Sequence, residues 1–225
     1  LRVLEDMAAI DLSNAVSTPE CSIKSAVIDV VSRLSVNRLQ QLSSPRLLNM
    51  LRYWVITKLE RQPTRNLLQE IEKTLINSQQ DANPEIIFND FVFRRFQGNI
   101  YLLKNRAVQQ LQHDVEWHPA EPITLEEAGI QVKAVASQGA GLNRELLAET
   151  LVIRSRKGGE KFHPAGRRHS QSLKKLLQEA NVPPWERDVV PLIYFADRLI
   201  AVGGIWVCKE YSVVEGGWLV EVDAV

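Results

Sequence analysis

The sequence has few of the features that mark secreted, membrane or metal-binding proteins. Its two cysteines, Cys21 and Cys208, lie far apart and outside any C-x-x-C spacing, so they predict neither a disulfide framework nor a zinc site, only buried or free thiols. No apolar run approaches the roughly 18 to 20 residues that cross a bilayer. The start, "LRVLEDMAAIDLSNA", has acids where a signal peptide needs an apolar core. We therefore expect a soluble, cytoplasmic protein without a membrane partner.

Motifs for nucleotide binding and catalysis are also missing. The glycines of "KGGEK" and "GAGL" fit neither G-x-x-x-x-G-K-[ST] nor a strand followed by G-x-G-x-x-G, so both stretches are interpreted as turns. No Ser-His-acid set and no carboxylate pair stands out. His163 and His169 lack a third ligand nearby in the sequence, which favours phosphate contact or plain exposure over a metal site. These residues are not expected to hold a cofactor, a metal or a catalytic group.

The first half of the chain shows helical periodicity. Residues 45–60, "PRLLNMLRYWVITKLE", have apolar residues at helical spacing, with Ser44 as candidate N-cap and Pro45 at the first helical position. A second helix is predicted from Thr64. The first dozen residues also predict a helix, which begins without a cap, as if cut from a longer element. We expect the chain to be a piece of a longer protein.

Near residue 85 the period changes from helical to extended. "EIIF", "FVFRRF" and "IYLLK" predict strands, the last two joined by the hairpin turn "QGN". "DVEWHPAEPIT" is interpreted as a linker or domain entry. Further strands are predicted in "IQVKAVA", "ETLVIRS", "PLIYF", "RLIAVGGIWVC" and "WLVEV", with one amphipathic helix in "SQSLKKLLQEAN".

The predicted fold class is α+β, with two domains. The first, residues 1–112, is a helical domain that ends in a hairpin; a substrate-recognition role for it is implied only by the family resemblance given below. The second, residues 113–225, is a layered mixed α/β domain with short strands and one amphipathic helix. A length of 225 residues with 45% hydrophobic content is enough to bury the core of each.

Charge is balanced overall but not along the chain. The sequence has 27 basic and 27 acidic residues, yet residues 154–175 hold eight Lys or Arg against one acid, Glu160, so this segment carries +7 and the remainder −7. Such an asymmetry points to a polyanion partner such as nucleic acid. The candidate contacts are Arg154, Arg156, Lys157, Lys161, His163, Arg167, Arg168, His169, Ser170, Lys174, Lys175 and Arg187.

The helix after the basic loop is expected to present part of this surface. With its leucines turned to the core, Lys174 and Lys175 face outward, and the helix N-terminus near Ser170 or Ser172 offers backbone N–H groups to a phosphate. A solvated charged face with a mobile turn at Gly158–Gly159 is the alternative. A module that binds an acidic protein partner through the basic loop is a further alternative.

Trp185 has two interpretations. It could stack on a base, but a Trp after two prolines is delivered to a fixed place, which suits packing in the core. We favour the core for Trp185.

Several motifs between residues 158 and 207 carry a family resemblance. "GGEKFHP", the basic loop, "SLKKLLQE", "VPPWERD" and "VGG" follow one another in the order found in the C-terminal domain of bacterial tRNA(Ile)-lysidine synthetases, which this stretch resembles. "LLNMLRYWV" is similar to that family's middle, helical domain, and "FVFRRFQGNIYLL" to the connection after it.

The resemblance implies a function that the residues alone do not. The family's enzyme uses ATP to attach lysine to the wobble cytidine of the isoleucine tRNA with a CAU anticodon. Its catalytic domain precedes these domains and carries an S-G-G-x-D-S pyrophosphate loop, which is absent from this sequence. The implied partners are that tRNA and the catalytic N-terminal domain of the same polypeptide; ATP is implied for the parent enzyme only. A homodimer is left open. The C-terminal domain also looks like a layered domain of the phenylalanyl-tRNA synthetase β chain.

Overall fold

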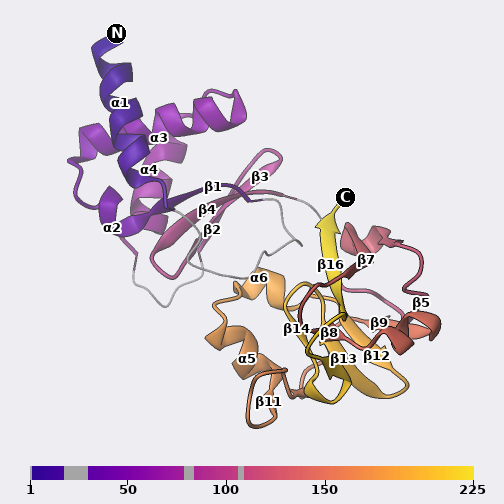
Figure 1. The fold of residues 1–225 in the computed structure, drawn as a ribbon. Helices are drawn as coiled ribbons and strands as arrows, with labels where there is room; N and C mark the ends of the chain where they lie inside the picture. The colour runs from indigo at the N-terminus through magenta and orange to yellow at the C-terminus, as the bar shows by residue number, and fades with distance from the viewer. Residues whose placement is uncertain (1, 18–29, 79–83, 106–108) are drawn as a thin grey trace. The chain divides into compact units, whose positions relative to one another are not determined.

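The computed structural model describes residues 2–17, 30–78, 84–105 and 109–225, which form two compact units. The first unit comprises the described residues up to 105, and the second comprises residues 109–225. Helices come first and strands dominate afterwards (Figure 1), so the predicted α+β class is confirmed. Cys21 lies outside the described residues, whereas Cys208 is a buried free thiol.

The first unit joins helices to an antiparallel sheet. Its strands have the order β1-β4-β3-β2. The elements are α1 (Arg2–Ala15), β1 (Val30–Ser35), α2 (Val36–Leu39), α3 (Ser44–Leu59), α4 (Arg65–Glu70), the π-helical turn η1 (Ile71–Ile76), β2 (Glu85–Phe88), β3 (Phe91–Phe96) and β4 (Asn99–Lys104).

The helix starts lie close to where the sequence places them. Helix α3 is capped one residue earlier than predicted, because Ser43, not Ser44, has the extended N-cap backbone, with φ −64° and ψ 149°. The Thr64 side chain caps α4 by accepting a hydrogen bond from the Leu67 N–H at 3.2 Å. At the β3–β4 turn, Gln97 and Gly98 both have positive φ, 45° and 71°, as the predicted tight hairpin requires.

The core of the first unit lies between the sheet and α3. Trp54 of α3 is fully buried and meets Phe93 of β3 edge-to-face, with ring centroids 5.6 Å apart. Its indole N–H donates to Ser32 Oγ on β1 at 3.0 Å, which satisfies its polar atom in the core. The helical face and the sheet therefore form one packed layer pair.

A buried cation closes the end of η1. Arg95 of β3 is 6% exposed, and its Nη1 lies 2.8 to 3.3 Å from the carbonyl oxygens of Leu75, Ile76 and Ser78. These carbonyls belong to the last turn of η1 and the residues after it, where backbone acceptors have no partner within the helix. Arg95 thus replaces the missing backbone donors.

The second unit contains two five-stranded antiparallel sheets and a short two-stranded ribbon. The sheet orders are β14-β13-β12-β9-β5 and β15-β8-β16-β7-β6, and the ribbon is β10-β11. The strands are β5 (Val115–Trp117), β6 (Ile123–Leu125), β7 (Ile130–Ala136), β8 (Gly141–Leu142), β9 (Leu151–Arg154), β10 (Lys161–Phe162), β11 (Gln171–Ser172), β12 (Leu192–Phe195), β13 (Arg198–Val202), β14 (Trp206–Val207), β15 (Ser212–Val213) and β16 (Trp218–Ala224).

The helices of the second unit are short. They are α5 (Leu173–Glu179) and α6 (Pro184–Arg187), with 3₁₀ turns η2 (Glu126–Ala128), η3 (Arg144–Ala148) and η4 (Lys209–Tyr211). The sequence predicted α5 but not α6. It also missed β1 in the first unit, and it interpreted "GAGL" as a turn although Gly141–Leu142 pair as β8.

The two sheets of the second unit share a core. Trp117 on β5 and Trp218 on β16 meet edge-to-face with centroids 6.0 Å apart, and both are almost fully buried. Trp117 belongs to the stretch interpreted as a linker or domain entry; it is not a linker but supplies β5 and β6 at the start of the second unit. On α5, the leucines Leu173, Leu176 and Leu177 are fully buried, as predicted, in a second cluster with Leu192 of β12.

Two glycines allow a close backbone approach beside this core. A Cβ on Gly141 would lie 2.6 Å from the Trp218 carbonyl oxygen, and a Cβ on Gly217 would lie 2.7 Å from the Gly141 Cα. Neither distance is compatible with a side chain, so glycine is needed for β8 to reach β16.

Candidate nucleic-acid interface

The basic segment, residues 154–175, runs from the end of β9 through the β10-β11 ribbon into α5. In the ribbon, Lys161 stands opposite Ser172, and Ser172 is the N-cap of α5. The backbone pairing therefore brings Lys161 next to the start of the helix that carries Lys174 and Lys175. The segment is therefore folded through the ribbon and is not an extended loop.

The chain between β10 and β11 is fixed to the neighbouring sheet. Ala165 N–H donates to the Val207 carbonyl at 2.9 Å, and Lys209 N–H donates to the His163 carbonyl at 2.9 Å. Pro164 forms a β-bridge with Cys208 between these two bonds. The loop thus extends the outer edge of β14, and its backbone is well anchored.

Several predicted cations have acidic partners that the sequence did not reveal. Arg154 Nε lies 2.8 Å from Asp114 Oδ2, and Arg167 Nη1 lies 2.6 Å from Glu179 Oε2. Arg156 Nη1 lies 3.5 Å from Asp188 Oδ1. All three acids come from outside the segment, and including them lowers its net charge from +7 to +4.

The remaining pairs are weaker. Lys157 Nζ lies 3.9 Å from Asp114 and Lys175 Nζ lies 3.8 Å from Glu179, and the two lysine side chains are 81% and 63% exposed. Exposed pairs at such distances contribute little to stability. Both ammonium groups therefore remain accessible to a phosphate.

Three of the predicted cations, Lys161, Arg168 and Lys174, are exposed and, within the residues that the structure describes, have no acid within 4.0 Å. His169 and Ser170 are exposed beside Arg168, although Ser170 Oγ donates to the Phe162 carbonyl at 3.3 Å. We call Lys161, Arg168 and Lys174 the open cations. They are the groups best placed to meet an anionic ligand.

Glu160, the lone acid of the segment, organises its first turn. One carboxylate oxygen accepts hydrogen bonds from the N–H groups of Lys157 and Gly158, both at 2.7 Å. The other lies 3.6 Å from Arg156 Nε. Gly158 and Gly159 have φ of 91° and 84°, which glycine adopts without strain. From the sequence, Glu160 contributes only a negative charge to the segment, and its hydrogen bonds to the backbone are not predicted.

The two histidines differ in exposure and do not form a metal site. His163 is partly buried, and its Nε2 lies 2.9 Å from the Arg167 carbonyl oxygen, so it closes the loop. Across the described ranges of the chain, no three His, Cys, Asp or Glu side chains gather as metal ligands would.

The N-terminus of α5 is partly occupied by its own side-chain cap. Ser172 Oγ accepts a hydrogen bond from the Lys175 N–H at 3.4 Å, and the helix has only seven residues. The side-chain cap takes up one of the backbone donors. That the remaining N–H groups of this terminus bind a phosphate stays a prediction. Lys174 and Lys175 face outward, as predicted.

The α6 turn departs from the sequence prediction. Trp185 is only partly buried and belongs to none of the core clusters, whereas its neighbour Glu186 is 2% exposed. Glu186 of the helical turn at Pro184–Arg187 is buried, whereas the Trp185 indole is buried only in part, with its Nε1 inward. The placement of Trp185 in the core was therefore wrong.

Arg187 is held by the backbone. Its Nε donates to the Val182 carbonyl at 2.7 Å. Burial lowers the pKa of the Arg187 guanidinium from its ordinary value, and the charge of Arg156 lowers it further, while Asp188 opposes both. The group remains charged at neutral pH, but it fixes the α5–α6 connection and is not aimed outward like the open cations.

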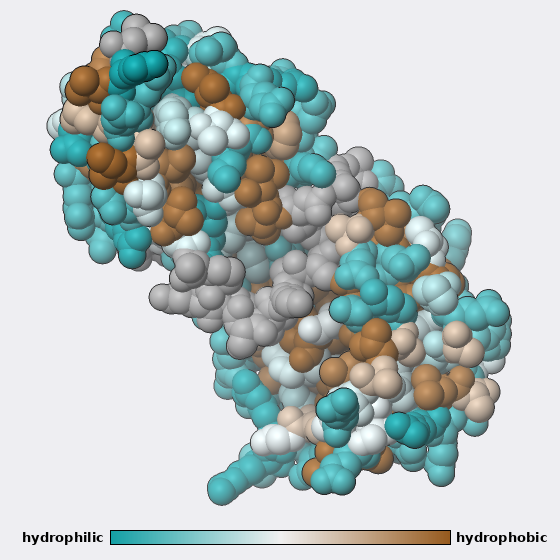
Figure 2. Space-filling view, turned by 45° about the horizontal axis from the view of Figure 1, so that its top comes forward, coloured by the Kyte–Doolittle hydropathy of each residue, from teal (hydrophilic) through white to brown (hydrophobic). Residues whose placement is uncertain are grey.

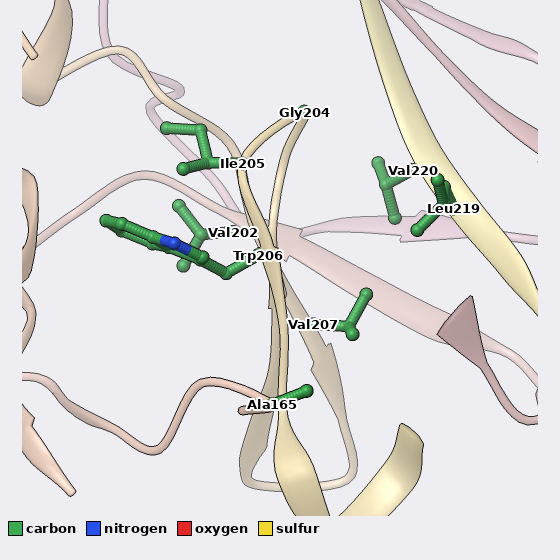
Figure 3. A pocket seen from close by; sticks show the side chains of 8 residues that line it. All are labelled: Ala165, Val202, Gly204, Ile205, Trp206, Val207, Leu219 and Val220. Carbon is green, nitrogen blue, oxygen red and sulfur yellow. The ribbon is translucent and has the colours of Figure 1, made fainter. Parts of the chain in front are cut away.

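An apolar pocket of about 260 Å³ lies beside the loop. Figure 3 shows Val207 of β14 on the side toward Leu219 and Val220 of β16, with Trp206 on the opposite side of β14. Ala165 of the loop completes the lining. The lining side chains carry no titratable or nucleophilic group, so the pocket offers no catalytic chemistry.

The comparisons with known proteins match both units. The model of the TilS substrate binding domain matches residues 34–101, and that of the TilS substrate C-terminal domain matches residues 151–223. The tRNA(Ile)-lysidine synthase of Coxiella burnetii is 34% identical over 194 residues, which is 85% of this chain and 43% of that protein. The chain belongs to this family, as a homologue of the C-terminal part of the tRNA(Ile)-lysidine synthases.

A second lysidine synthase supports this assignment. The tRNA(Ile)-lysidine synthase of Nitrosomonas europaea is 32% identical over 215 residues, covering 95% of this chain and 44% of that protein. A solved structure titled "Crystal structure of TILS C-terminal domain" is 19% identical with a TM-score of 0.39, covering 50% of this chain and 98% of that one. The chain thus spans less than half the length of the lysidine synthases it matches.

The C-terminal lysidine synthase match, residues 151–223, contains all twelve candidate contacts. Eleven of them lie in the basic segment and Arg187 lies after it, and the side chains of His163 and Arg187 are held in structural contacts. In the described part of the chain, no helix has the length and apolar character needed to cross a membrane.

Proposed function

We propose that this chain is the tRNA-binding part of a tRNA(Ile)-lysidine synthase. The single observation that carries the proposal is the group of open cations, Lys161, Arg168 and Lys174, exposed without acidic partners inside the residues matched by the family's substrate C-terminal domain. Lys157 and Lys175 extend this surface through exposed side chains. Cations arranged in this way bind phosphate groups along a nucleic-acid backbone.

The parent protein would carry out the chemistry elsewhere. The relatives are named tRNA(Ile)-lysidine synthases, and by the resemblance the whole enzyme uses ATP to attach lysine to the wobble cytidine of the CAU-anticodon isoleucine tRNA. The pyrophosphate loop of that reaction is absent from these 225 residues. The proposed division is that this chain holds tRNA in the cytoplasm while a catalytic domain of the same polypeptide modifies it.

The open cations are expected to contact backbone phosphate and not base edges. A lysine is a point charge that binds any phosphate, so Lys161 and Lys174 would position the tRNA without reading its sequence, whereas the guanidinium of Arg168 would hold a phosphate through two N–H groups. Arg154, Arg156 and Arg167 are committed to acids and contribute mainly to the shape of the surface. In this proposal the open cations provide the affinity for tRNA, and the paired arginines stabilise the folded surface.

Titration of CAU-anticodon isoleucine tRNA at several salt concentrations tests the proposal. The triple substitution of Lys161, Arg168 and Lys174 by Ala should weaken binding and lower the slope of log affinity against log salt by about two to three, since each lost phosphate contact removes somewhat less than one. Lys133→Ala is the matched control, because Lys133 lies on β7 and pairs with Glu221 and Asp223. An unchanged slope in the triple variant would favour the module that binds an acidic protein.

A further inference from the structure

Helix α1 has two apolar sides, and the first unit covers one of them. Ala8, Leu12 and Ala15 are between 1% and 8% exposed and belong to the core. The covered side is fixed to α3 by Asp11, whose carboxylate lies 2.6 Å from Arg46 Nη2. The orientation of α1 on the first unit is therefore set by both apolar packing and a partly buried ion pair.

The other side exposes large apolar residues. Val3, Leu4, Met7 and Ile10 are 69%, 58%, 38% and 59% exposed. Their spacing places them on one side of a helix, adjacent to the covered side. We call these four residues the α1 stripe. Figure 2 shows hydrophobic patches at the surface of the N-terminal unit, in the upper part of the view.

Four large apolar residues on one side of a fourteen-residue helix are unusual for a surface that stays in water. Single exposed apolar residues are common, but a contiguous group is typical of an interaction site. Apart from Asp11 on the covered side, α1 has a third side with polar residues such as Ser13, whose hydroxyl donates to the Ile10 carbonyl at 2.8 Å. The stripe is therefore a defined face with a polar border.

We propose that the α1 stripe is the docking face for the part of the lysidine synthase chain that these residues do not match. This inference rests on the proposed function, because it assumes a catalytic part in the same polypeptide. The inference adds the place where that part binds, which is the α1 stripe. It also adds the chemistry of the partner, which must present an apolar surface that covers Leu4, Met7 and Ile10. The polar border of α1 would then lie at the rim of the interface.

The occupant is argued from what the relatives contain. This chain matches 43% and 44% of the two lysidine synthases described above, so more than half of each lies outside the match. The matched models are the substrate binding and C-terminal domains, which places the unmatched part ahead of α1 in chain order. The alignment with the Nitrosomonas europaea protein covers 95% of this chain, so about eleven residues are unmatched and the fourteen-residue α1 lies at least partly within the homologous region.

Binding in trans provides the test. The unmatched N-terminal part of the Coxiella burnetii protein, in a preparation that unfolds cooperatively on heating, is labelled and titrated with this chain. The wild-type chain should bind it saturably, and Leu4→Glu or Ile10→Glu should weaken binding at least tenfold. Ser13→Glu, which adds the same charge on the polar side of α1, should bind like wild type. The affinity of every variant for tRNA should be unchanged.

Several results would overturn the inference. One is that Leu4→Glu and Ile10→Glu bind the N-terminal part as tightly as wild type does. Another is that the wild-type chain does not bind it. A third is that the wild-type chain forms a homodimer that Leu4→Glu converts to a monomer. The last result would assign the stripe to a second copy of this chain. If the wild-type chain binds the N-terminal part but does not bind tRNA, the proposed function is refuted and the docking face is not.

Discussion

Arg167 and Glu179 form an ion pair at the surface of the basic segment, with Nη1 and Oε2 2.6 Å apart. Glu179 also lies 3.8 Å from Lys175 Nζ. One carboxylate at the last residue of α5 thus restrains two cations of the candidate interface. It competes with any phosphate for both of them.

Glu179→Gln should therefore tighten tRNA binding severalfold. The substitution removes a negative charge from the interface and releases Arg167, so the salt slope should rise by about one. Stability should hardly change, because the pair is partly exposed and an acid at a helix C-terminus is unfavourable to the helix dipole. tRNA titration across salt concentrations measures both quantities. An affinity equal to or below that of wild type would show that Arg167 does not take part in binding.

Glu160→Gln should loosen the turn at Gly158. One carboxylate oxygen accepts both backbone hydrogen bonds at 2.7 Å. A neutral amide oxygen is a weaker acceptor than a carboxylate oxygen, and Gln would place its NH₂ group beside Arg156 where Glu160 has its second oxygen. We expect hydrogen exchange at the Lys157 and Gly158 amides to accelerate at least tenfold. Glu215→Gln, at an exposed position, is the control. Unchanged exchange at these amides would mean that the glycines hold the turn without Glu160.

Gly141→Ala should destabilise the second unit. The new Cβ would lie 2.6 Å from the Trp218 carbonyl oxygen, and backbone cannot move aside cheaply. We expect a loss of about 2 to 4 kcal/mol, in the range of overpacking and backbone strain. Gly139→Ala is a close control, because no atom lies within 4 Å of its Cβ. Thermal unfolding compares the two, and equal midpoints would contradict the close approach of β8 and β16.

Arg95→Met should destabilise the first unit by about 2 to 4 kcal/mol, since it removes the Arg95 donor from the carbonyls of Leu75 and Ser78, whereas the Ile76 carbonyl keeps the hydrogen bond from Gln40 Nε2. Arg95→Lys should recover part of the loss. Urea unfolding followed by Trp54 fluorescence reports on this unit, because Trp54 lies in its core. Arg65→Met, at an exposed position on α4, should be nearly neutral. A stable Arg95→Met variant would show that other donors satisfy these carbonyls.

The chain alone should form no lysidine. With no pyrophosphate loop among its 225 residues, it should bind tRNA without activating lysine. Incubation with ATP, lysine and CAU-anticodon isoleucine tRNA tests this, with a complete lysidine synthase as the positive control. Any product above background would contradict the proposed division of labour.

Local patterns predicted the elements that bury a regular stripe. The leucines of α5 and the alternating residues of β7 and β16 were predicted because their periodicity is visible in the sequence itself. Strand β1 was missed because it is stabilised by pairing with β4, with Val30 opposite Leu103, and such long-range pairing leaves little local signal. Trp185 was misplaced because a single turn of helix, α6, decides whether Trp185 or Glu186 faces inward.

For the candidate site, the sequence located the basic segment but overestimated its free charge. Asp114 lies forty residues before Arg154, and only the pairing of β5 with β9 brings them together. Charge counted along a chain omits acids supplied by neighbouring strands. For the same reason, the sequence could not separate Lys161, Arg168 and Lys174 from the arginines already bound to carboxylates.

The hydrogen bonds that fix His163 and Ala165 to Val207 and Lys209 have a second effect. They cover the outer edge of β14, which would otherwise present unpaired backbone groups to the strands of other molecules. The loop that carries Arg168 therefore also guards the sheet against intermolecular strand addition. A variant that deletes residues 163–170 would lose the proposed tRNA contacts and would also become prone to aggregation. Substitutions that change only the side chains would keep the edge of β14 covered.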